Sequence, residues 1–195
     1  GEGGMVLTNR EDLYEKLLLY RSHGITRNMA DMTHEPDGPW YYQQIELGFN
    51  YRMTDLQAAL GCSQMDRLDA FVARRRDLAA RYDALLRGLP VRTPYVMENT
   101  VPSWHIYIVQ VDFSEIGKMK VQVFQEMKER GIVLNLHYIP VHRQPYYEKL
   151  GFCKGDFPDS EQYYDAAFTL PLYYSLTEEQ QDRVVESLRD VISAS

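Results

Sequence analysis

The apolar positions between residues 54 and 88 recur every three or four residues and predict the strongest helix in the chain. Thr54 and Gln57 have the spacing of a capping box, in which each side chain satisfies a backbone group at a helix start. Gly88 is expected to end the helix. Gly61 inside it costs about 1 kcal/mol relative to Ala, which close packing against another backbone would offset. At 1.5 Å per residue the helix would measure roughly 50 Å, a length typical of a bridge between two lobes or of a subunit interface.

Shorter patterns on both sides of this helix predict an alternation of strands and helices. A strand–helix–strand run between residues 104 and 138 indicates a small α/β lobe. The expected elements are a strand at 5–8, a helix capped by Asn9 and running to Ser22, an irregular segment at 23–50, the helix at 54–88, a Pro-containing connection at 88–103, a strand at 104–111, a helix at 118–130, a strand at 132–138, a short helix at 160–168, an extended piece at 170–172, and a last helix that opens with the capping box of Thr177 and Gln180.

Composition is that of a globular protein. Hydrophobic residues make up 45% of the chain and charged residues 25%, values that argue against disorder. The chain has 195 residues, with 21 basic and 28 acidic side chains and a formal net charge of −7. That balance argues against a general nucleic-acid binder, which needs a basic surface. No window approaches the ~18 apolar residues of a membrane span. From the acidic charge and the lack of such a window, we expect neither a nucleic-acid nor a membrane partner.

The first residues of the chain and its two cysteines indicate whether it is a fragment and in which cellular compartment it folds. Residues 1–4, Gly-Glu-Gly-Gly, lack the basic and apolar regions of a signal peptide. A start at Gly1 instead of Met indicates a fragment. Cys62 and Cys153 lie far apart without a metal or redox spacing, which favours a reducing cytoplasm over one disulfide between them.

Two histidines and a tyrosine lie where the strand at 132–138 is expected to end. His137, Tyr138 and His142 are suited to binding a phosphate, orienting a sugar or ligating a metal. A metal is the weakest of these, because Pro140 forbids helical spacing and no nearby carboxylate or cysteine completes a ligand set. The alternative is a loop with a hydrogen-bonded histidine and a packed tyrosine.

An amide and a guanidinium, Asn50 and Arg52, lie just ahead of the long helix. Such groups near a helix N-terminus form a plausible anion site. Simple loop hydrogen bonding is the alternative.

Arg74, Arg75 and Arg76 form a basic run inside the same helix. Three consecutive helical residues point in three directions. We therefore expect a solvated face with ion pairs to nearby aspartates rather than a binding site.

Covalent catalysis has no obvious nucleophile in this chain. There is no Gly-x-Ser-x-Gly elbow and no phosphate-binding glycine loop followed by Lys and Ser or Thr. The six lysines, at positions 16, 118, 120, 128, 149 and 154, fall on expected helix surfaces or polar loops. None is expected to be desolvated in the way that a Schiff-base lysine requires.

A series of motifs in a fixed order identifies a family resemblance. The motifs are Gly-Glu-Gly-Gly-Met-Val-Leu-Thr at 1–8, Arg-Ser-His-Gly at 21–24, Gly-Phe-Asn-Tyr-Arg-Met at 48–53 with Gln-Ala-Ala at 57–59, the three arginines with Tyr82, His-Tyr-x-Pro-x-His at 137–142, and Leu-Pro-Leu at 170–172. Over essentially its whole length the chain resembles the DegT/DnrJ/EryC1/StrS sugar aminotransferases. Trp-Tyr-Tyr-Gln-Gln at 40–44 is most similar to the UDP-4-amino-4,6-dideoxy-N-acetyl-beta-L-altrosamine transaminases of the pseudaminic acid route.

The resemblance implies an α/β fold, the C-terminal half of an aminotransferase of fold type I that depends on pyridoxal 5'-phosphate (PLP). It implies a division into the tail of the PLP-binding large domain at 1–53, a long bridging helix at 54–88, and a small C-terminal α/β domain at 89–195. The lysine that holds PLP in the family is expected upstream of Gly1, so this chain contains no catalytic residue.

The resemblance also carries over individual residues. Asn50 matches the family asparagine that reaches the PLP phosphate of the neighbouring subunit, and Arg52, which follows it, is expected to help bind this phosphate or the nucleotide. This implies a homodimer with shared active sites. His137, Tyr138 and His142 match the segment near the nucleotide-sugar, and Tyr41 and Tyr42 are weaker candidates for closing the substrate pocket. No metal site is implied.

The implied reaction moves an amino group from glutamate to a UDP- or dTDP-linked 4-keto-6-deoxy sugar in surface-polysaccharide or glycan biosynthesis, in the cytoplasm. We expect the 195 residues alone to be inactive. The alternatives are a non-catalytic truncated module that dimerises or binds nucleotide-sugar, and a dehydratase of the same fold that lacks the lysine.

Overall fold

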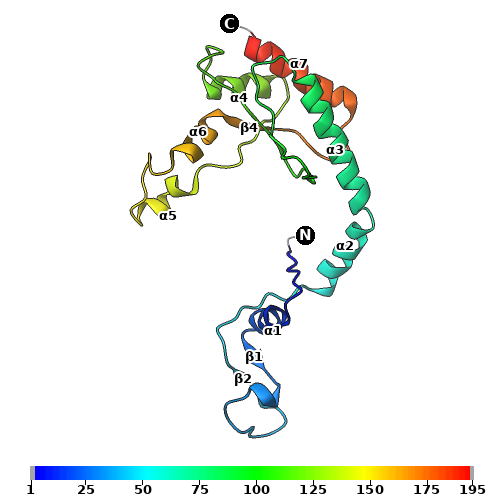
Figure 1. Cartoon of the computed structure of the whole chain (residues 1–195), viewed down its shortest axis with the longest axis vertical. Coiled ribbons are helices and arrows are strands. Elements are labelled where there is room, and N and C mark those ends of the chain that lie inside the picture. Colours follow the sequence, from blue (N-terminus) through cyan, green and yellow to red (C-terminus); the bar gives the residue numbers. More distant parts are fainter. Residues whose placement is uncertain (1–2, 194–195) are drawn as a thin grey trace. The chain divides into compact units, whose positions relative to one another are not determined.

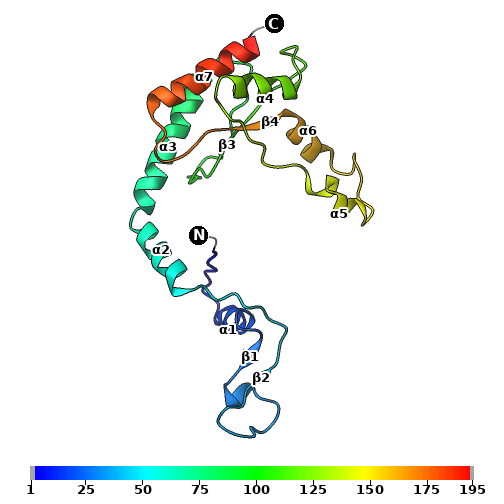
Figure 2. The ribbon, with the colours of Figure 1, turned by 180° about the vertical axis from the view of Figure 1, so that it is seen from behind.

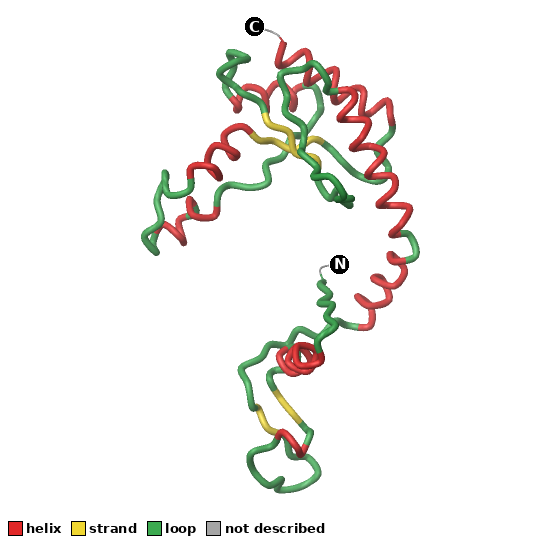
Figure 3. The backbone as a smooth tube through the Cα atoms, in the orientation of Figure 1, coloured by secondary structure: helices red, strands yellow, loops and turns green. Residues whose placement is uncertain are grey.

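The structure, a computed structural model, describes residues 3–193 and divides the chain into two compact units. The first unit ends at Arg67 and the second begins at Leu68. Most elements of each unit are labelled in Figure 1, and Figure 2, seen from behind, also labels β3. Figure 3 shows that loops connect most of these elements.

The first unit has little interior. Its elements are α1 (Glu11–Tyr20), β1 (Ile25–Thr26), the 3-10 helix η1 (Met29–Asp31), β2 (Gln43–Gln44) and α2 (Asp55–Met65). β1 and β2 pair as an antiparallel ribbon. Within residues 3–67 only Gly24, Thr26 and Gln43 are buried. Hydrogen bonds and tight turns, rather than an apolar core, therefore hold these described residues in place.

The second unit is built on a short antiparallel sheet. Its elements are α3 (Leu68–Leu85), β3 (Tyr107–Gln110), α4 (Lys120–Glu129), the 3-10 helix η2 (Val141–Arg143), α5 (Pro145–Glu148), α6 (Pro158–Ala166), β4 (Ala167–Leu170) and α7 (Glu178–Ser193). β3 pairs with β4, with Tyr107 opposite Leu170. α7 packs against both α3 and α4, in agreement with Figures 1 and 2.

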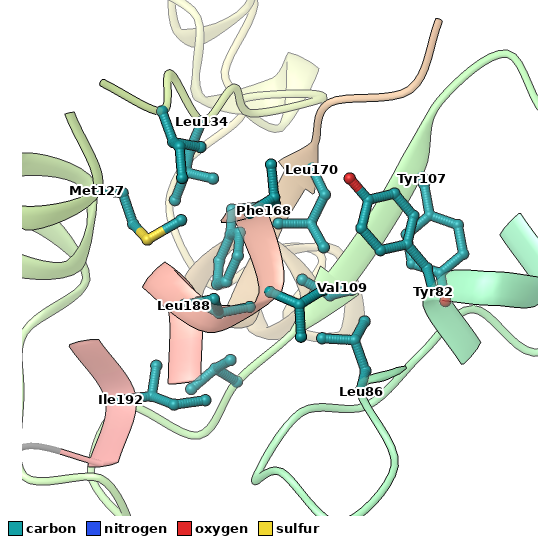
Figure 4. Packing of buried hydrophobic residues seen from close by; sticks show 14 of the residues in the cluster. Tyr82, Leu86, Tyr107, Val109, Met127, Leu134, Phe168, Leu170, Leu188 and Ile192 are labelled. Carbon is teal, nitrogen blue, oxygen red and sulfur yellow. The ribbon is translucent and has the colours of Figure 1, made fainter. Parts of the chain in front are cut away.

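The buried hydrophobic residues of the described chain all lie in this second unit, between Leu78 and Ile192 (Figure 4). Tyr82 of α3 stacks on Tyr107 of β3 with ring centroids 5.0 Å apart. The Tyr82 hydroxyl donates to the Pro171 carbonyl at 2.9 Å, and the Tyr107 hydroxyl donates to Asp83. Burial raises the pKa of both phenols, so they remain protonated donors. The core is therefore tied to the chain leaving β4 by a hydrogen bond as well as by packing.

Arg74, Arg75 and Arg76 bind backbone carbonyl groups, which corrects the solvated face with ion pairs expected from the sequence. Their acceptors are the carbonyl oxygens of Leu176 for Arg74, of Trp104, His105 and Leu172 for Arg75, and of Pro102 for Arg76, at 2.6 to 3.2 Å. All three are half-buried, and none forms an ion pair within residues 3–193. Because the three side chains diverge, each reaches a different stretch of loop and satisfies carbonyls that no strand pairs.

The continuous helix expected over 54–88 is also corrected. The structure has two helices there, α2 and α3, separated at Asp66 and Arg67. The Arg67 N–H bonds to the Gln64 carbonyl at 3.0 Å, a three-residue bond that tightens the end of α2. No residue of α2 is buried. α2 therefore has no packed apolar face that would stabilise one continuous helix through Asp66 and Arg67. α3 ends at Leu85, and Gly88 follows with a φ of 83°.

Two expected strands are absent from the described residues. Residues 5–8 lie in no strand, and residues 132–138 contribute one isolated bridge, between Asn135 and Thr169. An extended run forms a strand only where a partner offers a matching ladder. The buried Ile132 and Leu134 fill the core instead, so their apolar character reflects packing.

Two helix boundaries differ from expectation. Arg10, not Asn9, occupies the cap position of α1, and it makes no side-chain cap bond. α6 ends at Ala166, so that Phe168 belongs to β4.

The two capping boxes are confirmed. The Thr54 N–H donates to Gln57 Oε1 at 3.0 Å and the Gln57 N–H to Thr54 Oγ1 at 3.3 Å. Thr177 and Gln180 exchange the same bonds at 3.0 and 3.2 Å. Across residues 3–193 no helix combines the length and the apolarity that a bilayer crossing requires.

Substitutions of Gly61, within α2, and of Gly88, after α3, should act in opposite directions. A Cβ at Gly61 meets no atom within 4 Å, so the close backbone packing expected there is absent among the described residues. Gly61→Ala should stabilise α2 by about 1 kcal/mol and slow amide exchange of its last turns about fivefold. Gly88→Ala, the control, places a side chain at a left-handed φ and should cost about 1–2 kcal/mol. Exchange in α2 that is unchanged or faster in Gly61→Ala would contradict the open space seen at this position.

Candidate functional site

The end of α1 turns sharply into β1. His23 and Gly24 both have left-handed backbones, with φ of 63° and 68°. The Gly24 N–H bonds back to the Leu19 carbonyl at 2.9 Å, which closes the helix. Glycine adopts this conformation freely, but for His23 it costs about 1 kcal/mol. The surroundings of His23 must compensate for that cost.

A second segment passes directly against this turn. A Cβ at Gly48 would lie 2.3 Å from the Gly24 nitrogen, and a Cβ at Gly24 would lie 1.9 Å from the Glu46 carbonyl oxygen. Only glycine fits at either position. The two segments are joined by bonds from the His23 N–H to the Phe49 carbonyl at 2.8 Å and from the Tyr51 N–H to the Arg21 carbonyl at 2.9 Å.

Asn50 and Arg52 lie together beside this contact, and their assignment to an anion stays a prediction. The Arg52 Nε donates to Asn50 Oδ1 at 2.9 Å, and both side chains are exposed. The Arg52 Nη2 lies 3.5 Å from Nε2 of His23. Sequence reasoning quoted His23 within a motif but did not nominate it for the site. The remaining guanidinium nitrogens, the Asn50 amide and the imidazole form a group of donors without a carboxylate contact among the described residues.

Tyr41 and Tyr42 lie on a loop built around one buried side chain, Gln43. The Gln43 amide donates to the Tyr41 hydroxyl at 3.1 Å and accepts from the Thr33 N–H at 2.7 Å. The Tyr42 ring is exposed and lies 5.7 Å from the Arg27 guanidinium carbon. Both tyrosines thus have local partners, and Gln43, which sequence reasoning missed, fixes the loop that carries them.

His137 and Tyr138 lie together in the second unit. The His137 Nδ1 is 2.7 Å from the Thr169 hydroxyl, and its ring meets the Tyr138 ring edge-on with centroids 4.7 Å apart. Tyr138 is 72% exposed. Tyr138 is therefore open to a ligand, and His137 is anchored beside it.

His142 lies apart from this pair. It is buried, and its Nε2 is 2.8 Å from Glu161 Oε1, while Glu161 also accepts the Gly155 N–H at 2.6 Å. The Phe157 ring packs at 4.9 Å. The Gly155 N–H, and after it His142, hold the pKa of Glu161 below its ordinary value. His142 thus fastens η2 to α6, and its assignment to the substrate stays a prediction.

The lysines need one correction. Lys118 and Lys120 are half-buried, not on open surface. The Lys120 ammonium donates to the Tyr164 carbonyl and lies 4.8 Å from the Tyr164 ring centroid, and burial lowers the pKa of Lys120. Lys118 is paired with Glu126 at 2.8 Å. These contacts give both ammonium groups structural roles within the second unit.

A cleft of about 860 Å³ in the second unit contains none of the predicted site residues. It is lined mainly by acidic and apolar groups from the β3 end and α6. Within residues 3–193 no three His, Cys, Asp or Glu side chains are grouped to hold a metal. Cys62 and Cys153 are unpaired and exposed.

A family model of the DegT/DnrJ/EryC1/StrS aminotransferases matches residues 1–189. The chain belongs to the DegT/DnrJ/EryC1/StrS aminotransferase family. The resemblance drawn from the motif series is thereby confirmed, and so is the fold class.

Individual relatives match nearly the whole of this chain. The chain is 37% identical over 198 aligned residues to the spore coat polysaccharide biosynthesis protein SpsC of Bacillus subtilis, covering 100% of this chain and 51% of SpsC. It is 28% identical, with a TM-score of 0.81, to the PMP form of a chain described as a sugar aminotransferase, Spr1654 of Streptococcus pneumoniae, covering 96% and 46%. A PLP form of Spr1654 is similar at a TM-score of 0.79. The family's use of PLP is thus confirmed.

Helicobacter pylori PseC, described as an aminotransferase of pseudoaminic acid biosynthesis, superposes with a TM-score of 0.82 at 24% identity, covering 96% of this chain and 48% of PseC. At that identity the likeness shows the fold alone. The chain spans about half the length of the curated relatives it matches.

Removing the charge of Glu161 should change how stability depends on pH. Because the folded-state pKa of Glu161 is depressed, its ionised form stabilises the fold above its ordinary value of 4.5, and that contribution is lost as the pH falls through the folded value. Glu161→Gln keeps an acceptor oxygen for His142 and Gly155. It should lower the thermal midpoint by a few degrees at pH 7, and this difference should shrink as the pH falls through the folded-state pKa of Glu161.

Glu148→Gln, an exposed carboxylate of α5, is the matched control for this comparison. Thermal unfolding of the three proteins across the pH range measures the effect. A difference between wild type and Glu161→Gln that stays constant as the pH falls from 7 through the acid range would contradict the role assigned to ionised Glu161.

Proposed function

We propose that this chain is the C-terminal part of a PLP-dependent aminotransferase that transfers an amino group from glutamate to a nucleotide-linked 4-keto-6-deoxy sugar. The product would serve surface-polysaccharide or glycan biosynthesis. Its family membership and the polysaccharide role named for SpsC support the proposal. Within it, residues 1–53 are the tail of the large domain, residues 54–88 the connection, and residues 89–195 the small domain. The unpaired cysteines support a cytoplasmic setting.

The observation that carries the proposal is the fixed pair of Asn50 and Arg52. A phosphate group is bound by donors that are already positioned and that carry positive charge. The Arg52 Nε holds the Asn50 oxygen, so the amide nitrogen of Asn50 is left to donate. The glycine contact keeps both residues on one short, rigid turn. These residues thus fit the phosphate of PLP.

Each group in this chain then has a binding or positioning role. PLP, when bound, supplies the electron sink for moving the amino group, and the protein binds and orients it. Asn50 and Arg52 hold the phosphate of PLP on the neighbouring subunit of a homodimer. Tyr138, set by His137, contacts the nucleotide-sugar, His142 holds η2 in place through Glu161, and Tyr41 and Tyr42 close the pocket.

The lysine that carries PLP lies upstream of Gly1 in this proposal. Lys16 is the one lysine within residues 3–67, and it is exposed, which suits a surface role. The 195 residues alone are then inactive. The similarity of the loop at 40–44 to altrosamine transaminases makes a UDP-linked altrosamine precursor the first sugar to test, with dTDP-linked keto sugars next.

The test uses the natural protein in its full length, with Asn50→Ala and Arg52→Gln. Loss of hydrogen bonds to a charged group should weaken PLP binding roughly ten- to hundredfold in each. Amination of a UDP-linked 4-keto sugar by glutamate should fall at low PLP and recover in part at high PLP.

Arg87→Gln removes an exposed guanidinium from the second unit and is the control for lost charge. PLP affinities for Asn50→Ala and Arg52→Gln equal to that of wild type would overturn the assignment. Binding of nucleotide-sugar without PLP binding or turnover in the full-length protein would instead favour a non-catalytic binding module.

A further inference from the structure

His23, at the end of α1, has a left-handed backbone that is unfavourable for histidine. The turn itself does not need a histidine side chain at this position. His23 has a φ of 63°, which glycine or asparagine adopts more readily. Its N–H bonds to the Phe49 carbonyl at 2.8 Å, and its carbonyl accepts from Gln44 Nε2 at 2.9 Å. Any residue supplies these two backbone groups. The imidazole is therefore the part of His23 that the turn leaves unexplained.

The imidazole lies within the group of donors formed by Asn50 and Arg52. Its Nε2 is 3.5 Å from Arg52 Nη2, and Arg52 Nε holds the Asn50 oxygen at 2.9 Å. A neutral imidazole can accept a hydrogen bond from Arg52 at Nε2. If an anion lay between the imidazole and the guanidinium, both groups could instead donate to it. Among the described residues neither His23 nor Arg52 forms an ion pair. An oxyanion is the ligand that satisfies all three side chains.

We propose that His23 is a third ligand of the phosphate group bound by Asn50 and Arg52, held in place by its left-handed backbone. This inference rests on the proposed function, since it takes the same anion. The backbone of residues 22–24 fixes the imidazole from one side, and the bridge between Ser22 and Asn50 fixes the amide from the other. The phosphate belongs either to PLP or to the diphosphate of the nucleotide-sugar, and the experiment separates the two.

The decisive substitution is His23→Gly in the natural protein of full length. Glycine suits the backbone at this position, so a residue kept for the turn alone would gain or hold its thermal midpoint and keep its ligands. We expect the midpoint to hold, while the dissociation constant rises about tenfold for the phosphate-bearing ligand. His105→Ala, which removes an exposed imidazole from the second unit, is the control and should bind as wild type does.

Two ligands identify the source of the phosphate. Weaker binding of PLP, followed by its absorbance, assigns His23 to the cofactor. Weaker binding of uridine diphosphate, followed by calorimetry, assigns it to the nucleotide-sugar. If neither changes in His23→Gly while Arg52→Gln weakens PLP binding, His23 is not a ligand and the proposed function stands. If the binding of PLP and of uridine diphosphate is unchanged in both variants, both proposals fail.

A measurement on the unaltered protein covers the case in which His23→Gly does not fold. The imidazole resonances of His23 should shift in an NMR titration with PLP or with uridine diphosphate, while those of His105 stay in place. Resonances of His23 that do not move with either ligand would overturn the inference.

Discussion

The contact between the Gly24 and Gly48 backbones is the constraint on which the candidate site depends. A Cβ at either position would collide with main-chain atoms of the other segment, so no side-chain adjustment can relieve a substitution there. The contact aligns the end of α1 with the segment before α2 and lets Asn50 and Arg52 face His23. Within residues 3–67, where little is buried, such backbone fits replace the packing that positions a site in most folds.

In the second unit, two of the motifs shared with the family serve the packing of the fold. The arginines from Arg74 to Arg76 satisfy loop carbonyls, and Tyr82 bonds to Pro171 beyond β4. The unit has its own buried interior, with α7 packed on α3 and α4. The residues proposed to contact the ligand, of which Tyr138 is the most exposed, lie on loops that this interior supports.

The starts of α2 and α7 were predictable because the interactions that form them are local. Thr54 and Thr177 each bond to a residue three positions away, so spacing alone indicates them. The strand at 132–138 was wrong because pairing depends on a distant partner. The roles of Arg75 and His142 depend on carbonyls and a carboxylate far along the chain, which no local pattern contains. Asn50 and Arg52 could be proposed from the sequence because they lie two residues apart, whereas His23 lies 29 positions from Arg52, so its contact with Arg52 was not predictable.

Borohydride reduction of the natural full-length protein, followed by mass spectrometry, tests the central claim most directly, because it asks whether the protein that carries these 195 residues holds PLP on a lysine. Reduction converts such a linkage to a stable pyridoxyl group. The account predicts a chain about twice the 22.8 kDa of this sequence, with one pyridoxyl lysine on the N-terminal side of Gly1. A protein of about 22.8 kDa that carries no pyridoxyl group after incubation with PLP would contradict it.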